Sequence, residues 1–542
     1  MTKPFAITLD SASSRKNHTG AWRVRRPVYV DRLSPCDHAC PAGEKPQEWL
    51  GQAEEGDYRG AWNVLVRQNP IPAVMGRACY HPCETACNRA KLDASVSIHA
   101  VERFLGDLAI REHWRLPDPG KPTGKHILVI GGGPSGLSAA YHLTLSGHAV
   151  TLREAAPALG GMMRYGIPRY RLPREVLDAE IARLVDMGMR IETGARVDEA
   201  ARARIEGGFD ACFVAIGAHL ANRTEIPASD ATRILEATAL LRGMDEGEAP
   251  PRIGRRVAVY GGGNTAIDVA RTVKRLGAEE AWIVYRRTQA TMPAHSFEVR
   301  EAIEEGVQVR WLRTVQRVEA GRVVVERMEL DGAGHARPTG ELEALDVDTL
   351  VLAIGQNVDL SVVESAPGVH VVDHVVQVDE RMMTGHAGLF AGGDMVPCER
   401  TIAVAVGHGA KAARNIDAWL RSAKSDAPIE PPVAAFDSLN PWYFGEADQA
   451  VQPTLDALRR RTTFDEVHGG LDEEHALLEA RRCLSCGHCF ECDNCYGMCP
   501  DNAIVKLGPG RGFHIDLDYC KGCGICSNEC PSGAIAMVNE DV

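Results

Sequence analysis

The clearest hydrophobic pattern in this chain occurs twice. Residues 126–130 form a short apolar run that ends in glycines and leads into a helical pattern and a second apolar run. The same succession begins again at Arg255. Further apolar runs in residues 212–218, 350–356 and 388–396 also break at glycine. Short buried strands that alternate with helices are typical of parallel sheets, so we expect an α/β protein with two Rossmann-like nucleotide-binding domains.

The first of these patterns carries a dinucleotide-binding motif. Gly131, Gly133 and Gly136 occupy the G-x-G-x-x-G positions directly after the apolar strand. Glycines there let the backbone turn tightly and approach a pyrophosphate held at the N-terminus of the next helix. Glu154 ends the second strand, 23 residues beyond Gly131, where a carboxylate can accept a hydrogen bond from a ribose hydroxyl.

The second motif has the opposite charge at the corresponding strand end. Gly261, Gly263 and Ala266 fill its three glycine positions, and its second strand ends in Arg286 and Arg287. A carboxylate would repel a 2′-phosphate, whereas paired guanidinium groups bind one by charge-assisted hydrogen bonds. We therefore expect this site to prefer NADPH to NADH. The alternative is that the two arginines are surface residues after an edge strand.

Two dinucleotide folds in one chain suggest a flavin on the first and a nicotinamide on the second. Asp394 follows the apolar strand in residues 388–396, where a carboxylate can accept hydrogen bonds from the sugar-alcohol chain of a flavin. The candidate flavin residues are Gly131, Gly133, Pro134, Ser135, Gly136, Glu154, Gly161, Gly217 and Asp394. The candidate nicotinamide residues are Gly261, Gly263, Asn264, Thr265, Ala266, Arg286 and Arg287.

Ten cysteines lie in the last sixty residues, and eight of them form two complete C-x2-C-x2-C-x3-C runs, each followed by proline. This is the spacing of bacterial ferredoxins, in which the fourth cysteine of each run binds the other run's [4Fe-4S] cluster. We expect Cys489, Cys492, Cys495 and Cys530 to hold one cluster, and Cys499, Cys520, Cys523 and Cys526 the other. Zinc sites or a disulfide framework are the less specific alternatives.

Bulk properties exclude several classes of function. The chain has 542 residues, 45% hydrophobic and 25% charged, and a net charge of −13, which argues against nucleic acid as a partner. No apolar run approaches the ~18–20 residues that span a bilayer. Seventeen cysteines without an export signal indicate thiolate ligands in a reducing compartment, so we expect a cytoplasmic protein.

Several motifs together resemble the glutamate synthase small-subunit family. They are GGGPSGLSAAYHL, LGGMMRYGIPRYRLP (residues 159–173), VYRRT with MPA after it, and FAGGD. That family includes the NADPH-binding half of dihydropyrimidine dehydrogenase and the large subunit of NADH-dependent ferredoxin:NADP oxidoreductase. The resemblance covers about residues 30 to 420 and implies that NADPH reduces FAD and that [4Fe-4S] clusters carry the electrons onward. The added ferredoxin module is similar to that of electron-input subunits of 2-oxoacid:ferredoxin oxidoreductases.

The amino-terminal region contains too few cysteines for two clusters of its own. Residues 36–104 hold Cys36, Cys40, Cys79, Cys83 and Cys87 amid a helical pattern. The resemblance implies two clusters here, one with a Gln or Glu as its fourth ligand, and a leading C-x2-C pair that this chain lacks at that place. Cys483 and Cys486 resemble the missing pair and are surplus to the ferredoxin runs.

Our hypothesis is that the two ends of the chain share a cluster. Cys36, Cys87, Cys483 and Cys486 would hold one cluster, and Cys40, Cys79, Cys83 and Glu102 the other, for four clusters in total. The alternative is a single amino-terminal cluster, with Cys483 and Cys486 as free thiols or as ligands that cap a neighbouring chain. Cys212 and Cys398 match no ligand set, and we expect structural roles for both.

The expected activity is electron transfer between NADP(H) and a low-potential iron–sulfur partner, with no side chain acting as acid, base or nucleophile. We expect the NADP-reactive subunit of a hetero-oligomeric complex, whose partner is ferredoxin or an iron–sulfur or thiamine-diphosphate subunit of a 2-oxoacid oxidoreductase, for instance one acting on 2-oxoglutarate. The alternatives are a glutamate synthase small subunit and a redox sensor or scaffold without turnover.

The predicted order of domains follows from these motifs, with the nicotinamide domain inserted into the flavin domain. It comprises a helical [4Fe-4S] domain (residues 1–118), a first part of the FAD-binding domain (122–240), an NADPH-binding domain (241–358), the second part of the FAD-binding domain (359–422), a linker and connector (423–480) and an α+β ferredoxin-like domain with two [4Fe-4S] clusters (481–542).

Overall fold

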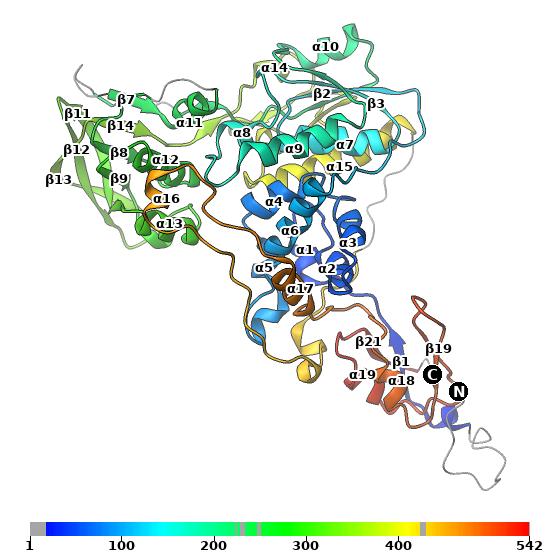
Figure 1. The fold of residues 1–542 in the computed structure, drawn as a ribbon. Helices are drawn as coiled ribbons and strands as arrows, with labels where there is room; N and C mark the ends of the chain where they lie inside the picture. The colour runs from blue at the N-terminus through cyan, green and yellow to red at the C-terminus, as the bar shows by residue number, and fades with distance from the viewer. Residues whose placement is uncertain are drawn as a thin grey trace.

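Two parallel sheets lie side by side at the top of Figure 1, with a group of short helices below them and a small ferredoxin-like unit at the bottom. The computed structural model describes residues 18–222, 224, 226–227, 233–246, 251–422 and 430–540. Residues 1–17 of the predicted helical domain and 423–429 of the predicted linker lie outside this description. Among the described residues, no helix has the length and apolar character needed to cross a bilayer.

The first sheet is built around the first glycine motif. Its order is β18-β5-β2-β3-β4 and all its pairings are parallel. Its strands are β2 (His126–Ile130), β3 (Ala149–Arg153), β4 (Arg190–Glu192), β5 (Ala211–Val214) and β18 (Leu389–Ala391). Its helices are α7 (Pro134–Leu145), α8 (Met162–Tyr165), α9 (Arg174–Val185), α10 (Ala200–Glu206), α14 (Ser361–Glu364) and α15 (Ile402–Leu420). Because β18 returns to pair with β5, the chain leaves this fold and rejoins it, as the order of motifs predicts.

The second sheet is built around the second glycine motif and has the order β10-β9-β8-β14-β7, again parallel. Its strands are β7 (Arg233–Glu236), β8 (Arg256–Tyr260), β9 (Glu280–Tyr285), β10 (Val307–Trp311) and β14 (Thr349–Leu352). Its helices are α11 (Ala237–Asp245), α12 (Asn264–Arg275) and α13 (Ser296–Glu304). Since β7 pairs with β14, this sheet begins before residue 241, the predicted boundary.

A three-stranded antiparallel sheet covers one side of the second fold. It contains β11 (Arg313–Glu319), β12 (Arg322–Leu330) and β13 (Ala336–Asp346), and its buried valines share a core with Trp282 of β9. Where the chain crosses between the two folds, β6 (Leu220–Ala221) pairs with β15 (Gln356–Asn357). A separate small hairpin joins β16 (Val371–Val372) to β17 (Val375–Val376).

Short helices form the middle of the molecule. They are α1 (Pro35–Ala39), α2 (Pro46–Glu54), α3 (Tyr58–Leu65), α4 (Pro72–Ala78), α5 (Pro82–Thr85) and α6 (Ile98–Arg111). Four of them begin with proline, whose fixed φ suits the first helical position and whose missing N–H costs nothing there. Their core, with Trp49 and Leu50 fully buried, also contains Ala476 and Ala480 of α17 (Glu473–Arg481). A helix near the carboxyl end of the chain therefore belongs to the amino-terminal domain.

The ferredoxin-like unit is completed by the amino-terminal strand. It contains α18 (Asn494–Met498), α19 (Ile525–Asn528), β19 (Ile504–Lys506), β20 (Phe513–Ile515) and β21 (Ile535–Asn539). Strand β1 (Arg25–Tyr29) pairs antiparallel with β21, so that Tyr29 lies opposite Ile535. The two ends of the chain thus meet in one sheet.

The connector between the nucleotide folds and the ferredoxin-like unit packs against other domains. Glu466 forms ion pairs with Arg77 (2.7 Å) and Arg103 (3.0 Å) of the helical domain. The N–H of Val467 donates to the carbonyl of Tyr170 in the first fold. Arg460 in α16 (Arg459–Thr462) pairs with residues of α13. Contacts with three separate domains hold this segment in place.

Candidate cofactor sites

A cavity of about 480 Å³ opens at the carboxyl ends of the first sheet. Its walls include most of the residues that the sequence assigns to flavin binding, namely Gly131, Gly133, Pro134, Ser135, Glu154, Gly161, Gly217 and Asp394. Gly136 lies beneath it in α7, where a Cβ would fall 1.9 Å from the carbonyl oxygen of Gly131. The structure therefore brings together groups that lie up to 263 residues apart, from Gly131 to Asp394, around one space.

Local geometry makes this cavity suitable for a dinucleotide. Gly131 has φ +105°, and a Cβ there would meet the carbonyl oxygen of Ala215 at 2.3 Å. The chain then enters α7, whose first N–H groups have no partner within the helix and would hold a pyrophosphate. The Ser135 hydroxyl is buried and has no hydrogen-bond partner among the described residues, which leaves it available to a bound phosphate.

Two carboxylates, Glu154 and Asp394, line this cavity. Glu154 accepts hydrogen bonds from the backbone N–H groups of Gly132 (2.6 Å) and Ala156 (2.7 Å), which orients it beside the glycine turn. Asp394 lies just past β18, and burial raises the pKa of its carboxyl. A buried oxygen there is satisfied by a hydroxyl donor, as the sugar-alcohol chain of a flavin supplies. The residues present fit FAD.

The cavity also has walls that sequence reasoning missed. Met162, Tyr165, His219 and Arg242 line it, and the Arg242 guanidinium lies 4.8 Å from the centre of the Tyr165 ring. Arg242 belongs to α11 of the second fold. Met162 and Tyr165 lie within the motif at residues 159–173, whereas Arg242 reaches the cavity only through the packing of one domain on the other.

The second glycine loop lies between β8 and α12. Gly263 has open space where a Cβ would stand, and Gly262 packs against the ring of Tyr285. The Asn264 side-chain oxygen accepts a hydrogen bond from the His295 N–H (3.0 Å). Thr265 is half-buried in the first turn of α12, and Ala266 is buried where a third glycine would stand. The open space at Gly263, directly before the N-terminus of α12, can accommodate the pyrophosphate of a nicotinamide dinucleotide.

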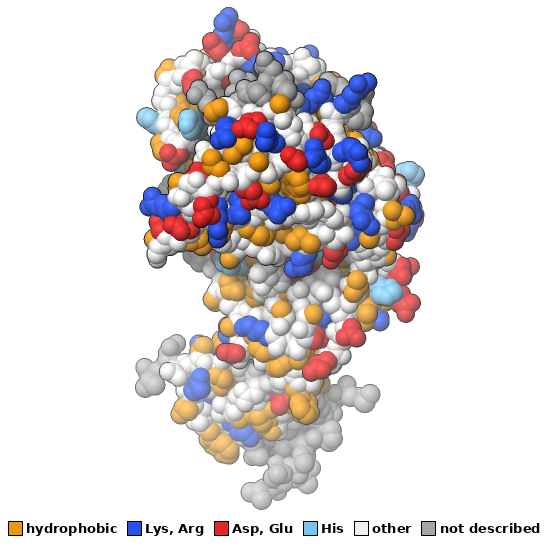
Figure 2. All heavy atoms as spheres, turned by 90° about the vertical axis from the view of Figure 1, so that its left-hand side faces the viewer, with side chains coloured by type: hydrophobic (Ala, Val, Ile, Leu, Met, Phe, Trp, Pro, Cys, Tyr) orange, Lys and Arg blue, Asp and Glu red, His pale blue; other side chains and the backbone are white. Residues whose placement is uncertain are grey.

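Arg286 and Arg287 lie beside this loop. Both follow the last residue of β9, and the Gly261 N–H donates to the carbonyl of Val284 in the same strand end (3.1 Å). Both side chains are exposed, and no ion pair holds either one among the described residues. Figure 2, which faces this fold, shows acidic and basic side chains interspersed rather than a continuous basic surface. Because both side chains are exposed and neither is held in an ion pair among the described residues, a ligand can contact them.

The ferredoxin cysteines gather in the two sets predicted from their spacing. Cys499, Cys520, Cys523 and Cys526 line a cavity of about 20 Å³. In the other set, burial raises the pKa of the Cys495 thiol, a hydrogen bond from Tyr29 lowers it, and the nearby Cys489, Cys492 and Cys530 raise it further. Each set draws one cysteine from the opposite run.

The amino-terminal cysteines line two further cavities. One, of about 10 Å³, is lined by Cys40, Cys79, Cys83 and Glu102, together with Glu44, His81 and His99. The other, of about 20 Å³, is lined by Cys36, Cys87, Cys483 and Cys486. The structure thus places Cys483 and Cys486 beside amino-terminal cysteines.

Glu102 is a buried carboxylate on α6. Its Oε1 accepts a hydrogen bond from Asn69 Nδ2 (2.8 Å), so Asn69 fixes its direction. Burial and then the neighbouring Glu44 raise its pKa well above the ordinary value, while burial raises the pKa of Glu44 to about 7. Three thiols and the Glu102 carboxylate line the same cavity. The donor set fits a [4Fe-4S] cluster with one oxygen ligand.

Histidines form part of the same wall, although the sequence offered no ligand pattern for them. His81, Glu84 and His99 can bring one ligand atom each within 4.8 Å of one another. His99 Nδ1 and Glu84 are already hydrogen-bonded (2.7 Å), and His99 Nε2 meets Gln452 (2.9 Å). These contacts support a structural role beside Cys79 and Cys83.

Comparison with known proteins agrees with this arrangement. A family model described as pyridine nucleotide-disulphide oxidoreductase matches residues 125–409, more than half of the chain. Models for the 4Fe-4S domain II of dihydropyrimidine dehydrogenase and for a 4Fe-4S dicluster domain match residues 26–114 and 488–534. The chain belongs to the pyridine nucleotide-disulphide oxidoreductase family, and it is an NAD(P)H-dependent iron–sulfur flavoprotein oxidoreductase subunit.

Two relatives that match most of this chain are named as beta subunits. The chain is 33% identical over 503 residues to the NADP(+)-dependent formate dehydrogenase subunit beta of Moorella thermoacetica, covering 84% of this chain and 70% of the relative. It is 32% identical over 520 residues to the NADPH-Fe(3+) oxidoreductase subunit beta of Geobacter sulfurreducens, covering 85% and 77%. Among solved structures, Mycobacterium tuberculosis FprA in complex with NADPH is 20% identical, with a TM-score of 0.46, covering 57% of this chain and 88% of that one.

These comparisons confirm the predicted fold class, the FAD and NAD(P) binding, and the presence of [4Fe-4S] clusters. They also confirm the likeness to the amino-terminal half of dihydropyrimidine dehydrogenase. Despite the name of the family, residues 213–397 contain no cysteine, so the second fold has no redox disulfide.

Proposed function

We propose that this member of the pyridine nucleotide-disulphide oxidoreductase family carries electrons between NADP(H) and an iron–sulfur partner through its own clusters. One contact carries the proposal. Gly407 on α15 lies so close to the loop after Cys40 that a Cβ there would fall 2.0 Å from the Pro41 carbonyl oxygen. Ala405, two residues earlier, lines the flavin cavity. The flavin fold and the first cysteine-lined cavity therefore adjoin.

When bound, FAD supplies hydride acceptance from NADPH, and the clusters supply one-electron transfer. The chain holds these groups in order. Cys40 and Cys79 pack against the core of the flavin fold, whereas Cys83, Cys87 and Cys483 pack against the core of the helical domain. The ferredoxin-like unit follows at the far end of the molecule (Figure 1).

Selection of NADPH rests on Arg286 and Arg287. A 2′-phosphate bound at the end of β9 would meet two exposed guanidinium groups and no described carboxylate partner that competes for them. The neighbouring glycine loop would hold the pyrophosphate. The names of the relatives, one NADP(+)-dependent and one using NADPH, support the same choice.

The partner is an oxidoreductase subunit with its own redox centre, and we propose that the pair forms a hetero-oligomer. The two relatives named above are beta subunits, which supports a complex of this kind. We propose that this partner belongs to the class of 2-oxoacid:ferredoxin oxidoreductases, with 2-oxoglutarate as one substrate, and that the complex is cytoplasmic.

Anaerobic stopped-flow measurement tests the proposal. NADPH should bleach the flavin absorbance near 450 nm rapidly, NADH much more slowly, and the broad iron–sulfur absorbance should then fall. Slow or absent bleaching by both nucleotides would overturn the proposal in favour of a sensor or scaffold. Affinity purification under anaerobic conditions identifies the partner, since a glutamine-hydrolysing subunit would contradict the 2-oxoacid class and favour glutamate synthase.

A further inference from the structure

We infer that Cys36, Cys87, Cys483 and Cys486 form one [4Fe-4S] site that closes the two ends of the chain on each other. This inference deepens the proposed electron route, but its test measures iron and does not depend on electron transfer. The family match at residues 26–114 includes only Cys36 and Cys87 of this set.

The cavity itself is the first argument. All four cysteines line it, and its volume of about 20 Å³ equals that of the cavity lined by Cys499, Cys520, Cys523 and Cys526. Cys36 and Cys486 are each only 8% exposed, and all four are free thiols. Four thiols around one space, two of them buried and two half-buried, match the ligand set of a [4Fe-4S] cluster.

Hydrogen-bond donors surround the carboxyl-terminal pair. Asn88 Nδ2 donates to the Sγ of Cys486 (3.5 Å), and the Ser485 N–H donates to the Sγ of Cys483 (3.5 Å). Asn88 directly follows Cys87, so the donor comes from the other end of the chain. Donors of this kind stabilise the negative charge on cluster-bound sulfur.

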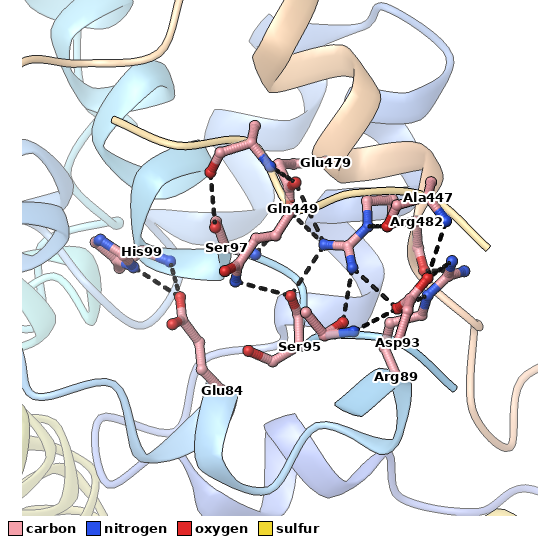
Figure 3. Close-up of polar contacts among 12 residues, drawn as sticks. Glu84, Arg89, Asp93, Ser95, Ser97, His99, Ala447, Gln449, Glu479 and Arg482 are labelled. Carbon is pink, nitrogen blue, oxygen red and sulfur yellow. Dashed lines mark hydrogen bonds and ion pairs between the residues drawn. The ribbon is translucent and has the colours of Figure 1, made fainter. Parts of the chain in front are cut away.

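Buried ion pairs and hydrogen bonds join Arg482 to the segment that follows Cys87, beside the cavity (Figure 3). Arg482 directly precedes Cys483, is 2% exposed, and pairs with Asp93 (3.0 Å) and Glu479 (2.9 Å). It also donates to the carbonyl of Ser95 (2.9 Å). Arg89 returns a hydrogen bond from Nη1 to the carbonyl of Arg482 (3.2 Å). These contacts position Cys483 against the segment that follows Cys87 without any help from a metal.

Glu479 and Arg482 also form hydrogen bonds with backbone groups of the connector. Glu479 accepts hydrogen bonds from the N–H groups of Ser97 (2.7 Å) and Ala450 (2.5 Å), and Arg482 Nε donates to the carbonyl of Ala447 (3.2 Å). A buried arginine with this many partners has little freedom to move. The backbone at Arg482 is therefore fixed, and with it the positions of Cys483 and Cys486.

The spacing of cysteines explains how one segment serves two sites. From Cys483 to Cys495 a cysteine occurs at every third position. The first two face Cys36 and Cys87, and the next three belong to the ferredoxin set. Between them Gly487 has φ +79°, and a Cβ there would fall 2.6 Å from Arg32 Cβ. This glycine lets the chain turn from one site to the next, so the two clusters would be neighbours along the backbone.

Iron analysis of the anaerobically purified full chain tests the inference. With four clusters the chain should hold about 16 iron and about 16 labile sulfide atoms. The Cys483→Ser, Cys486→Ser double variant should hold about 12 of each. A Cys36→Ser, Cys87→Ser double variant should lose the same electron paramagnetic resonance signal. Cys398→Ser, which changes a cysteine outside the three cysteine-lined cavities described above, should keep all four clusters.

Several results would overturn the inference. They are about 12 iron atoms in the unmodified chain, full iron retention in the Cys483→Ser, Cys486→Ser variant, or loss of different signals from the two double variants. FAD content and bleaching by NADPH should persist in both variants, because the flavin cavity is elsewhere. If bleaching fails in the unmodified chain while the iron results hold, the proposed function is wrong and this site remains.

Discussion

The hydroxyl of Tyr29, in the first strand of the chain, lies 3.4 Å from the Sγ of Cys495, a cysteine of the ferredoxin-like unit. The contact exists because β1 pairs with β21, and the Tyr29 ring lies near that of Phe513. An amino-terminal residue is thereby placed to donate a hydrogen bond to a cluster ligand.

We predict that Tyr29→Phe makes the midpoint potential of the Cys489, Cys492, Cys495 and Cys530 cluster more negative. Removing a donor destabilises the reduced, more negatively charged cluster by about 1 kcal/mol, or on the order of 40 mV. Potentiometric titration followed by electron paramagnetic resonance measures the shift. Tyr443→Phe is the matched control, because the Tyr443 hydroxyl bonds to Glu529 instead of a cysteine. Equal shifts in both variants would contradict this role.

Arg286 and Arg287 should set nucleotide preference. Replacing both with alanine removes charge-assisted hydrogen bonds to a 2′-phosphate, so KM for NADPH should rise by about 10- to 100-fold while KM for NADH changes by less than about threefold. Steady-state reduction of a dye measures both. Arg255→Ala removes an exposed arginine of the same fold that pairs with Glu279, and it should change neither value. A parallel loss with both nucleotides would refute the assignment.

Glu154 should control flavin retention. In Glu154→Gln the orienting contact with the Gly132 N–H is kept by the amide oxygen, but the charge that strengthens a bond to a ribose hydroxyl is lost. We expect FAD to dissociate about tenfold more readily, since such a bond contributes about 1.5 kcal/mol. Flavin content after gel filtration at low concentration measures this. Glu192→Gln, at the end of the next strand, should retain FAD as the unmodified chain does.

Glu102 should be the oxygen ligand of the Cys40, Cys79 and Cys83 cluster. In Glu102→Ala this cluster loses its fourth protein ligand, so a chelator should remove its iron at least about tenfold faster. Iron release followed by absorbance measures the rate. Glu44→Gln alters the other carboxyl group in the same cavity and should leave the rate unchanged. If Glu44→Gln alone accelerates the loss, Glu44 is the ligand.

The buried ion pairs around Glu305 should stabilise the second fold. Glu305 is fully buried and pairs with Arg271 and Arg275, each at 2.7 Å. In Glu305→Gln the buried Arg275 loses its charged partner, so the free energy of unfolding should fall by about 3–5 kcal/mol. Arg271 and Arg460, which also pair with Glu305, keep Glu301 and Glu304. Denaturant unfolding followed by tryptophan fluorescence measures it. The neighbouring Glu304 is largely exposed, and Glu304→Gln should cost less than about 1 kcal/mol.

The nucleotide-binding motifs and the ferredoxin runs could be identified from the sequence because their geometry is local. A strand, a glycine turn and a helix within thirty residues fix where the N–H groups of a phosphate site point. The three closely spaced cysteines of each ferredoxin run can reach one cluster, and the fourth ligand comes from the matching run. Gly131, Glu154, Gly261 and Cys520 therefore stand where the pattern places them.

Only the tertiary structure decided what happens between distant segments. Arg242 reaches the flavin cavity, Tyr29 reaches Cys495, and β7 joins the second sheet through contacts that no local period encodes. The order of motifs predicted a linker and connector in residues 423–480, yet this segment packs on three domains through Arg460, Glu466 and Val467. The number of cysteines raised the question of where Cys483 and Cys486 belong. Their position beside Cys36 and Cys87 depends on the buried pairing of Arg482 with Asp93, an interaction between residues 389 positions apart.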